Sequence, residues 1–311
     1  MAGDLTFDAG GVRFGFEICE DAWSADRPGI SLCRRGVDVI LNPSASHFAF
    51  GKNAVRQRFI LEGSRAFHAA YVYANLLGNE SGRAIFDGEA MIACGGRLVA
   101  TAERFSYQDF SVISAQVDLD LGRVAQGRSF SAIPDLAGQE AGCLTAPFVW
   151  PDLDPEPAGR DAEPWEAAPD LKLEEFSRAV PLALFDYLRK SRSRGFVVSL
   201  SGGADSTSLV VLIRLMVELG TEELGIEGFK KKLAWHAEVQ AAADPAGLVR
   251  ALLTTAYRHA DASVVAPFEY TSMLLALGVG FLYLLQRIDS SLRTVDEVED
   301  RLSLLGARHA R

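Results

Sequence analysis

One short stretch constrains the fold of this chain more than any other. It follows Gly195–Val198, a β-branched and aromatic run that predicts a buried strand, and it precedes Thr207–Leu219, a nearly continuous apolar run that predicts a packed helix. The stretch consists of Ser199, Leu200, Ser201, Gly202, Gly203, Ala204, Asp205 and Ser206. A strand, a small-residue loop and a helix in this order can hold phosphate, because the glycines let the backbone approach an anion and the helix N-terminus faces it.

Asp205 is the unusual residue of this loop. A carboxylate that faces a triphosphate repels it unless a cation lies between them, so a Mg²⁺ ion bridging Asp205 and the phosphates is the simplest account. Ser201 and Ser206 can add hydroxyl donors. The loop lacks the lysine of a Walker motif. On Gly202 and Gly203 alone, an ordinary tight turn remains an equal alternative.

The complete stretch resembles the SGGxDS pyrophosphate loop of the N-type ATP pyrophosphatases. This resemblance implies a doubly wound parallel sheet. It also implies a reaction in which ATP is cleaved to AMP and pyrophosphate while a substrate is adenylated. The loop alone therefore indicates a reaction type and leaves the substrate open.

Length and charge set broad limits. The 311 residues are enough for two domains of ~100–200 residues each. A net charge of −10 and a pI of about 5.1 argue against non-specific nucleic-acid binding and favour a cytoplasmic protein. The four cysteines have no metal-ligand spacing, so neither a zinc site nor a disulfide framework is indicated: Cys19, Cys33, Cys94 and Cys143.

Strand and helix patterns alternate in the first 150 residues, which predicts an α/β layered domain. A Gly95-Gly96 pair between two apolar runs predicts a hairpin. Pro43 is expected to end the predicted strand Val37–Asn42. The predicted strands are Val12–Ile18, Val37–Asn42, Tyr71–Asn75, Glu89–Cys94, Arg97–Ala102 and Ser111–Val117, and the predicted helices are roughly Gly29–Arg35 and Asn53–Ala70.

The second part of the chain follows a proline-rich acidic stretch at 151–170, which predicts a linker. Leu171–Arg194 has the pattern of an amphipathic helix, and the region from the phosphate loop to Tyr257 is rich in helical patterns. We therefore expect a first domain at 1–150 and a second at 171–311. The latter contains an atypical apolar stretch at 261–285. Its uncharged run 273–285 has 13 residues, fewer than the ~20 that a membrane span needs.

Cys19 is the candidate nucleophile. It lies where a predicted strand ends and an acidic turn begins, and nearby helix N–H groups would favour the thiolate there. A buried structural cysteine is an equal alternative on spacing alone.

Four segments of the first part resemble the nitrilase-like amidases: Gly15–Trp23, Asn42–Lys52, Asn75–Glu80 and Phe86–Gly88. The second of them is similar to the corresponding loop of the glutamine-hydrolysing members, and the last two continue the match. The resemblance implies an α-β-β-α sandwich in which a cysteine attacks an amide carbon, forms a thioester and releases ammonia. It assigns Cys19 as the nucleophile and the backbone N–H of Glu20 as an oxyanion donor. It also places Ser46 and Lys52 where the family contacts glutamine.

The order of the two parts resembles the glutamine-dependent NAD⁺ synthetases, over roughly Val12–Tyr257. This resemblance implies a carbon–nitrogen ligase that adenylates deamido-NAD⁺ with ATP and Mg²⁺ and then amidates it with ammonia from glutamine. It implies no tightly bound organic cofactor, no nucleic-acid partner, and the homo-oligomers and cytoplasmic location of that family.

The family pattern is incomplete in this sequence. The family's catalytic Glu and Lys lie upstream of the cysteine, whereas no lysine precedes Cys19 and Glu17 lies inside a predicted strand. We therefore expect a chain that is truncated at both ends and does not hydrolyse glutamine unaided. Two alternatives remain: a stand-alone nitrilase-type amidase, and a non-catalytic nucleotide-binding fragment.

Overall fold

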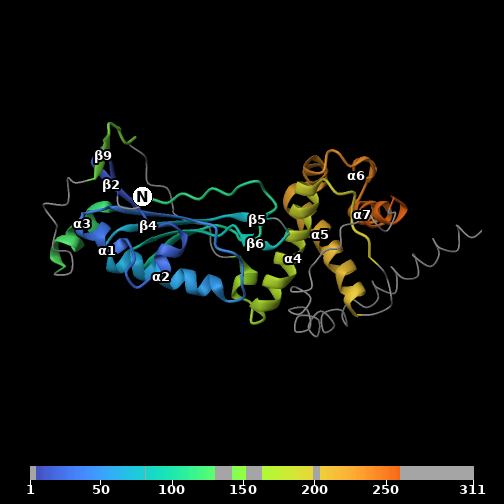
Figure 1. The fold of residues 1–311 in the computed structure, drawn as a ribbon, viewed down its shortest axis with the longest axis horizontal. Helices are drawn as coiled ribbons and strands as arrows, with labels where there is room; N and C mark the ends of the chain where they lie inside the picture. The colour runs from blue at the N-terminus through green and yellow to red at the C-terminus, as the bar shows by residue number, and fades with distance from the viewer. Residues whose placement is uncertain (1–4, 81, 130–141, 152–162, 199–203, 260–311) are drawn as a thin grey trace, which may run out of the picture. The chain divides into compact units, whose positions relative to one another are not determined.

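The computed structural model describes residues 5–80, 82–129, 142–151, 163–198 and 204–259 (Figure 1). Contacts divide the chain into two compact units. The first comprises Met1–Ser191 with Glu223–Gly225, and the second comprises Arg192–Glu222 with Ile226–Arg311. The phosphate-loop residues 199–203 and the apolar stretch 261–285 lie outside the described residues. Among the described helices, none is long and apolar enough to cross a membrane.

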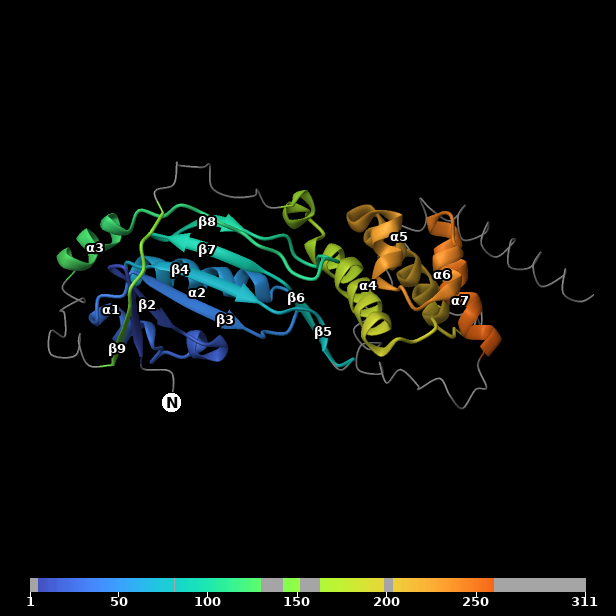
Figure 2. The same cartoon turned by 90° about the horizontal axis from the view of Figure 1, so that it is seen from above.

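A seven-stranded mixed sheet forms the centre of the first unit, in the order β8-β7-β4-β3-β2-β1-β9 (Figure 2). Strands β2, β3 and β4 run parallel, as do β1 and β9, and the other neighbouring pairs are antiparallel. The strands are β1 (Thr6–Ala9), β2 (Val12–Phe16), β3 (Val39–Ser44), β4 (Ala70–Asn75), β7 (Ala90–Cys94), β8 (Arg97–Thr101) and β9 (Cys143–Ala146). This mixed α/β architecture agrees with the predicted fold class.

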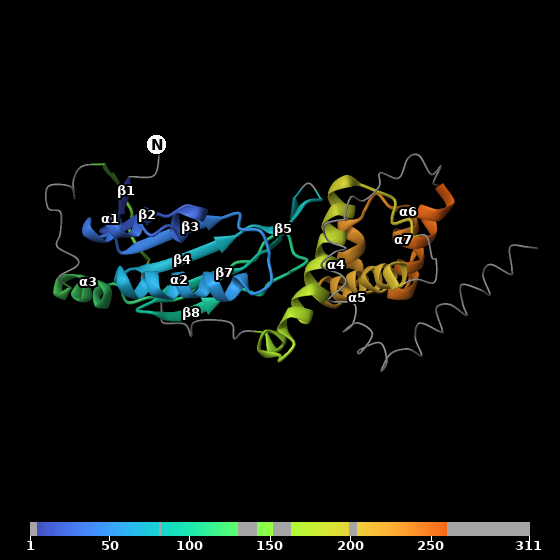
Figure 3. The same ribbon diagram turned by 60° about the horizontal axis from the view of Figure 1, so that its bottom comes forward.

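Two helices connect the parallel strands. Helix α1 (Gly29–Arg34) lies between β2 and β3, and α2 (Lys52–Ala66) lies between β3 and β4 and packs on β4, β7 and β8 (Figure 3). The core between helices and sheet includes Leu32, Ile40, Ile60, Tyr71 and Met91, which are all almost fully buried. Because β2 and β3 are parallel, the turn after β2 and the loop after β3 leave the sheet at the same edge.

A second, two-stranded sheet and one long helix extend the first unit. Strand β5 (Leu77–Glu80) pairs with β6 (Ala84–Asp87), and α4 (Leu171–Ser191) packs on both. The Asp186 carboxylate accepts the Asn79 N–H at 2.7 Å, and Lys190 Nζ donates to the Asn79 carbonyl at 2.6 Å. Contacts therefore group α4 with the first unit, whereas the sequence pattern groups it with 171–311. This unit also contains helix α3 (Leu119–Arg128) and the 3₁₀ turns η2 (Cys19–Trp23) and η4 (Pro164–Ala167).

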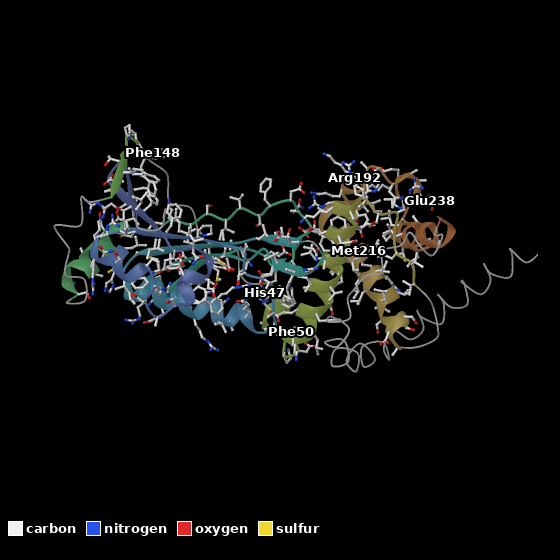
Figure 4. All side chains as sticks on the ribbon, in the orientation of Figure 1. His47, Phe50, Phe148, Arg192, Met216 and Glu238 are labelled. Carbon is white, nitrogen blue, oxygen red and sulfur yellow. The ribbon has the colours of Figure 1, made fainter. Side chains whose placement is uncertain are left out.

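The described part of the second unit is helical. It contains α5 (Ala204–Lys232), α6 (Ala237–Ala241) and α7 (Pro245–His259). Gly225 interrupts α5 with φ 69° and ψ 164°. Met216, labelled in Figure 4, and Ile213 are fully buried on α5.

Three sequence predictions about strands are wrong. Gly195–Val198 forms no strand, and none of the described second-unit residues forms a strand beside it that could complete a ladder. Ser111–Val117 is irregular, with Val112 79% exposed, so its alternation reflects a half-exposed segment without a ladder. Pro43 does not end its strand, because β3 continues to Ser44. The pairing of β3 with β2 ends at Leu41, so the missing N–H of Pro43 removes no hydrogen bond to β2.

Candidate functional site

Cys19 opens a tight turn directly after β2. It has φ 51°, in the left-handed region that few non-glycine residues adopt. The turn is closed by the Asp21 N–H, which donates to the Ile18 carbonyl at 3.1 Å, and by the Asp21 carboxylate, which accepts the Ile18 N–H at 2.9 Å. Cys19 is partly exposed. A strained backbone at a partly exposed cysteine is the kind of feature that clusters at functional sites.

Glu20 is the second residue of the 3₁₀ turn η2 and its side chain is exposed. The first amides of such a turn have no acceptor within it, so the Glu20 N–H is available in principle to an oxygen outside the turn. This placement suits the predicted oxyanion role of Glu20, which stays a prediction.

Lys52 reaches the cysteine turn from the loop after β3. The loop, residues 45–51, ends at Gly51 with φ 72°, and Lys52 is the first residue of α2. Lys52 Nζ donates to the His47 carbonyl at 3.0 Å and lies 5.7 Å from the centre of the Trp23 ring. Burial and then Arg56 lower the pKa of Lys52, while Asp87 and Cys19 oppose this shift. The structure thus brings Lys52 within electrostatic reach of Cys19.

Ser46, the second predicted glutamine contact, is buried in the same loop. Its N–H donates to the Asn75 side-chain oxygen at 2.8 Å, and its carbonyl accepts from Asn75 Nδ2 at 2.9 Å. Arg56 approaches the Ser46 hydroxyl at 3.3 Å. Figure 4 labels the next residue, His47, whose pKa is lowered mainly by Lys52. The position of Ser46 is therefore fixed by buried hydrogen bonds.

A buried cluster around Arg56 lies behind this loop, and the sequence reasoning did not single it out. Arg56 is fully buried on α2 and donates to Asp87 at 2.5 Å and to Glu89 at 3.2 Å. Its other terminal nitrogen donates to the carbonyls of Ser46 at 2.8 Å and His47 at 3.2 Å. The sequence marks Phe86-Asp87-Gly88 only through its resemblance to the amidases, and no pattern of neighbouring residues predicts that Asp87 pairs with Arg56.

Glu89 gives this cluster an uneven charge. Burial raises the pKa of Glu89 to about 8, with Asp87 acting in the same direction and Arg56 and Arg104 against it. Near neutral pH, Glu89 therefore retains its proton while sharing Arg56 with Asp87.

Glu17, two residues before Cys19, serves as a fixed structural acceptor. It is fully buried, and its carboxylate accepts from Arg27, from the Gly29 N–H at 2.6 Å and from the Tyr71 hydroxyl at 2.6 Å. With these donors in place, Glu17 is part of the core and lies inside the protein rather than at an open site.

The second predicted site is described only at its helical end. Ala204 and Asp205 are exposed in the first turn of α5, and Ser206 is partly buried there. Ser199, Leu200, Ser201, Gly202 and Gly203 lie outside the described residues. Within the described ranges, no group of three or more His, Cys, Asp or Glu side chains could hold a metal ion. The single carboxylate of Asp205 is compatible with a Mg²⁺ ion that is held mainly by phosphates.

The mixed sheet and its helices define this chain as an α/β protein with a cysteine turn after a parallel strand. Comparison with known proteins narrows this class. The chain is 30% identical over 301 residues to a glutamine-dependent NAD(+) synthetase of Oryza sativa subsp. indica, a match covering 94% of this chain and 40% of the relative. A Saccharomyces cerevisiae protein of the same name is 30% identical over 232 residues, covering 71% of this chain and 31% of the relative.

A crystal structure gives the same assignment. The glutamine-dependent NAD(+) synthetase of Cytophaga hutchinsonii matches with a TM-score of 0.56 and 34% identity, over 80% of this chain and 34% of that chain. No protein-family model matches. The chain belongs to the glutamine-dependent NAD(+) synthetases, and it spans about 40% or less of the length of these relatives.

Proposed function

We propose that this chain takes part in glutamine-dependent NAD⁺ synthesis. In that reaction ATP adenylates deamido-NAD⁺, and ammonia from glutamine displaces AMP, with pyrophosphate as the other product. The observation that carries this proposal is that Lys52 Nζ lies 5.7 Å from the centre of the Trp23 ring, in the turn that begins at Cys19, in a chain related to synthetases of this name over 94% of its length.

The first unit supplies the glutamine-handling residues. The Cys19 thiolate attacks the side-chain amide carbon of glutamine, and the Glu20 N–H donates to the oxyanion that forms. Collapse of this intermediate passes a proton to the leaving nitrogen, expels ammonia and leaves a γ-glutamyl thioester on Cys19, which water hydrolyses to glutamate. In the family that proton comes from the catalytic Glu, which has no counterpart in this sequence, so we expect this chain not to complete the hydrolysis unaided. Lys52 pairs with the glutamine carboxylate, and Ser46 contacts the same substrate. This assignment is supported by the hydrogen bond of Lys52 Nζ to the carbonyl of His47, the residue after Ser46.

The second unit supplies the nucleotide loop. The stretch Ser199–Ser206 binds the phosphates of ATP, with the first turn of α5 directed at them. Asp205 would hold Mg²⁺ through the phosphates, and that ion neutralises their charge. The family relation further leads us to propose a cytoplasmic homo-oligomer without a tightly bound organic cofactor.

The glutamine site is tested with 6-diazo-5-oxo-L-norleucine, a glutamine-shaped electrophile. We expect it to label Cys19 stoichiometrically, and we expect L-glutamine to slow the labelling. Mass spectrometry locates the adduct. The Cys94→Ala variant is the matched control, because Cys94 is another partly exposed thiol, and it should label like the native protein. Equal labelling of several cysteines, or no slowing by glutamine, would contradict the proposal.

The nucleotide site is tested separately by measuring ATP affinity with and without Mg²⁺. Because Asp205 acts through the cation, Asp205→Asn should weaken Mg²⁺-dependent binding by about tenfold, comparable to the loss of one charged contact. Asp244→Asn changes an exposed carboxylate elsewhere in the second unit and should have no effect. Unchanged Mg²⁺-dependent affinity in Asp205→Asn would show that this loop is not the ATP site.

A further inference from the structure

The loop at 45–51 carries two residues of the proposed glutamine site but has little regular structure of its own. Within it, the Phe48 N–H donates to the Ile85 carbonyl at 2.6 Å, and the Lys52 N–H donates to the Ala49 carbonyl at 3.1 Å. The remaining contacts that hold its buried side come from side chains. Asn75 binds both backbone groups of Ser46, and Arg56 binds the carbonyls of Ser46 and His47.

Arg56 joins this loop to the sheet. One terminal nitrogen donates to the two loop carbonyls, and the other donates to Asp87 and Glu89. Asp87 also accepts from Asn75 Nδ2 at 2.7 Å, so both side chains that hold the loop rest on the same carboxylate. The side chains of Arg56, Asp87 and Glu89 are at most 1% exposed, which excludes water from these contacts.

We propose that Arg56 is the positioning residue of the glutamine site. It touches none of the atoms that react. Its guanidinium donates to the backbone carbonyls of Ser46 and His47 and so fixes the position of the loop after β3. The His47 carbonyl in turn accepts from Lys52 Nζ. Lys52 lies four residues before Arg56 on α2, so the two side chains share one helix face.

An arginine is needed here because of its shape. A planar fork with five N–H donors reaches two carbonyls and two carboxylates from one buried point. A lysine at 56 would keep the positive charge, but its three donors radiate from one nitrogen and cannot span both groups. Arg56→Lys therefore separates the positioning role from the charge.

The matched control is Arg104→Lys. Arg104 is also buried, is paired with two carboxylates, Glu166 and Glu175, and makes no hydrogen bond to the loop at 45–51 in the described structure. Both substitutions should lower thermal stability. Only Arg56→Lys should release the loop.

Hydrogen exchange tests the positioning role directly, without reference to any ligand. In Arg56→Lys we expect the Ser46 and Phe48 amides to exchange about tenfold faster, while amides in β4 and β7 change far less, because a charged hydrogen bond contributes about 1.4 kcal/mol or more. Arg104→Lys should leave both loop amides at their native rates. If the loop exchanges at the native rate in folded Arg56→Lys, or only as much faster as the whole first unit, the inference is wrong.

The link to glutamine rests on the proposed function and has its own measurement. Cys19 is alkylated with iodoacetamide at rising L-glutamine concentrations. We expect Arg56→Lys to need about tenfold more glutamine for half protection, while its alkylation rate without glutamine stays within about threefold of native. An unchanged half-protection concentration would overturn the positioning role. If glutamine protects no form of the protein, the proposed function fails, and the exchange result alone decides whether Arg56 positions the loop.

Discussion

Two of the buried arginine clusters in the first unit, around Arg27 and Arg56, differ in their charge balance. Arg27 faces one carboxylate, Glu17, whereas Arg56 faces two, Asp87 and Glu89. Both clusters lie beneath loops at the same edge of the sheet. The Arg27 cluster binds only groups of the core, whereas the Arg56 cluster also binds the loop that carries Ser46.

The Arg27 cluster is balanced and closed. Glu17 accepts from Arg27, the Gly29 amide and the Tyr71 hydroxyl, and Tyr71 also accepts from Asn42 Nδ2 at 3.0 Å. The Arg27 guanidinium lies 5.2 to 5.8 Å from three aromatic ring centres. One positive and one negative charge face each other in this cluster, and each is surrounded by further donors or aromatic rings.

The Arg56 cluster is uneven in charge, and its hydrogen bonds are less complete. Two carboxyl groups share one guanidinium, and burial together with Asp87 raises the pKa of Glu89 to about 8, which favours its protonated form near neutral pH. Among the described residues, the Arg56 Nε–H has no acceptor. Asp87 and Glu89 accept from only one terminal nitrogen of Arg56, so the other terminal nitrogen can donate to the carbonyls of the loop at 45–51.

The largest effect is expected where the balanced cluster loses its charge. Glu17→Gln leaves Arg27 buried without a counter-ion, so we expect a loss of about 3–5 kcal/mol in the free energy of unfolding, as for other broken buried pairs. Chemical denaturation followed by circular dichroism measures this. Glu62→Gln, which breaks an exposed pair with Arg65 that water screens, should change the free energy of unfolding far less. A Glu17→Gln loss as small as that of Glu62→Gln would mean that the cluster does not hold the core.

The uneven cluster should instead reveal itself through pH. The Glu89 pKa is raised from 4.5 to about 8, so between these values the folded state keeps a proton that the unfolded state releases. Stability contributed by this group is full below about pH 4.5 and falls as pH rises toward 8, by at most about 1.4 kcal/mol per pH unit. Glu89→Gln stays neutral throughout, so its stability relative to the native protein should increase with pH across this window.

Denaturation of native protein and Glu89→Gln at pH 5, 6.5 and 8 measures that difference. A stability difference that is constant with pH would show that Glu89 is ionised in the folded protein, and the contrast between the clusters would then disappear.

The elements around these clusters were predictable, but the clusters themselves were not. Alternating patterns and the Gly95-Gly96 turn predicted β2, β4 and the β7–β8 hairpin, because each signal is local. The strand predicted at Gly195–Val198 failed because a strand also needs a ladder, which no local pattern supplies.

The site shows the same limit. Cys19 and Lys52 were found through segments that resemble a family, and the structure brings them together. Arg56 lies in a helix segment with Arg58 and Gln57, where a charged residue ordinarily faces solvent. Its burial depends on carboxylates more than 30 residues away, at Asp87 and Glu89, and only the packing of α2 on the sheet brings them into contact.

The smallest expected effect is the loss of a single tyrosine hydroxyl group near each cluster. Tyr71 and Tyr73 lie on the same strand and are both at most 1% exposed. The Tyr71 hydroxyl donates to Glu17 and accepts from Arg27 and Asn42, so Tyr71→Phe leaves buried partners unpaired and should cost about 1–3 kcal/mol. The Tyr73 hydroxyl lies near Ser44 without a hydrogen bond of normal geometry.

Tyr73→Phe should therefore change the free energy of unfolding by less than about 0.5 kcal/mol, because no partner loses a hydrogen bond. Both values come from the same denaturation experiment, and the two substitutions remove the same atom at equal burial. Since the hydrophobic terms cancel, the difference between the variants reports hydrogen bonding alone. Equal losses would mean that the Tyr73 hydroxyl makes a stabilising hydrogen bond in the folded protein, and the contrast between these two hydroxyl groups would disappear.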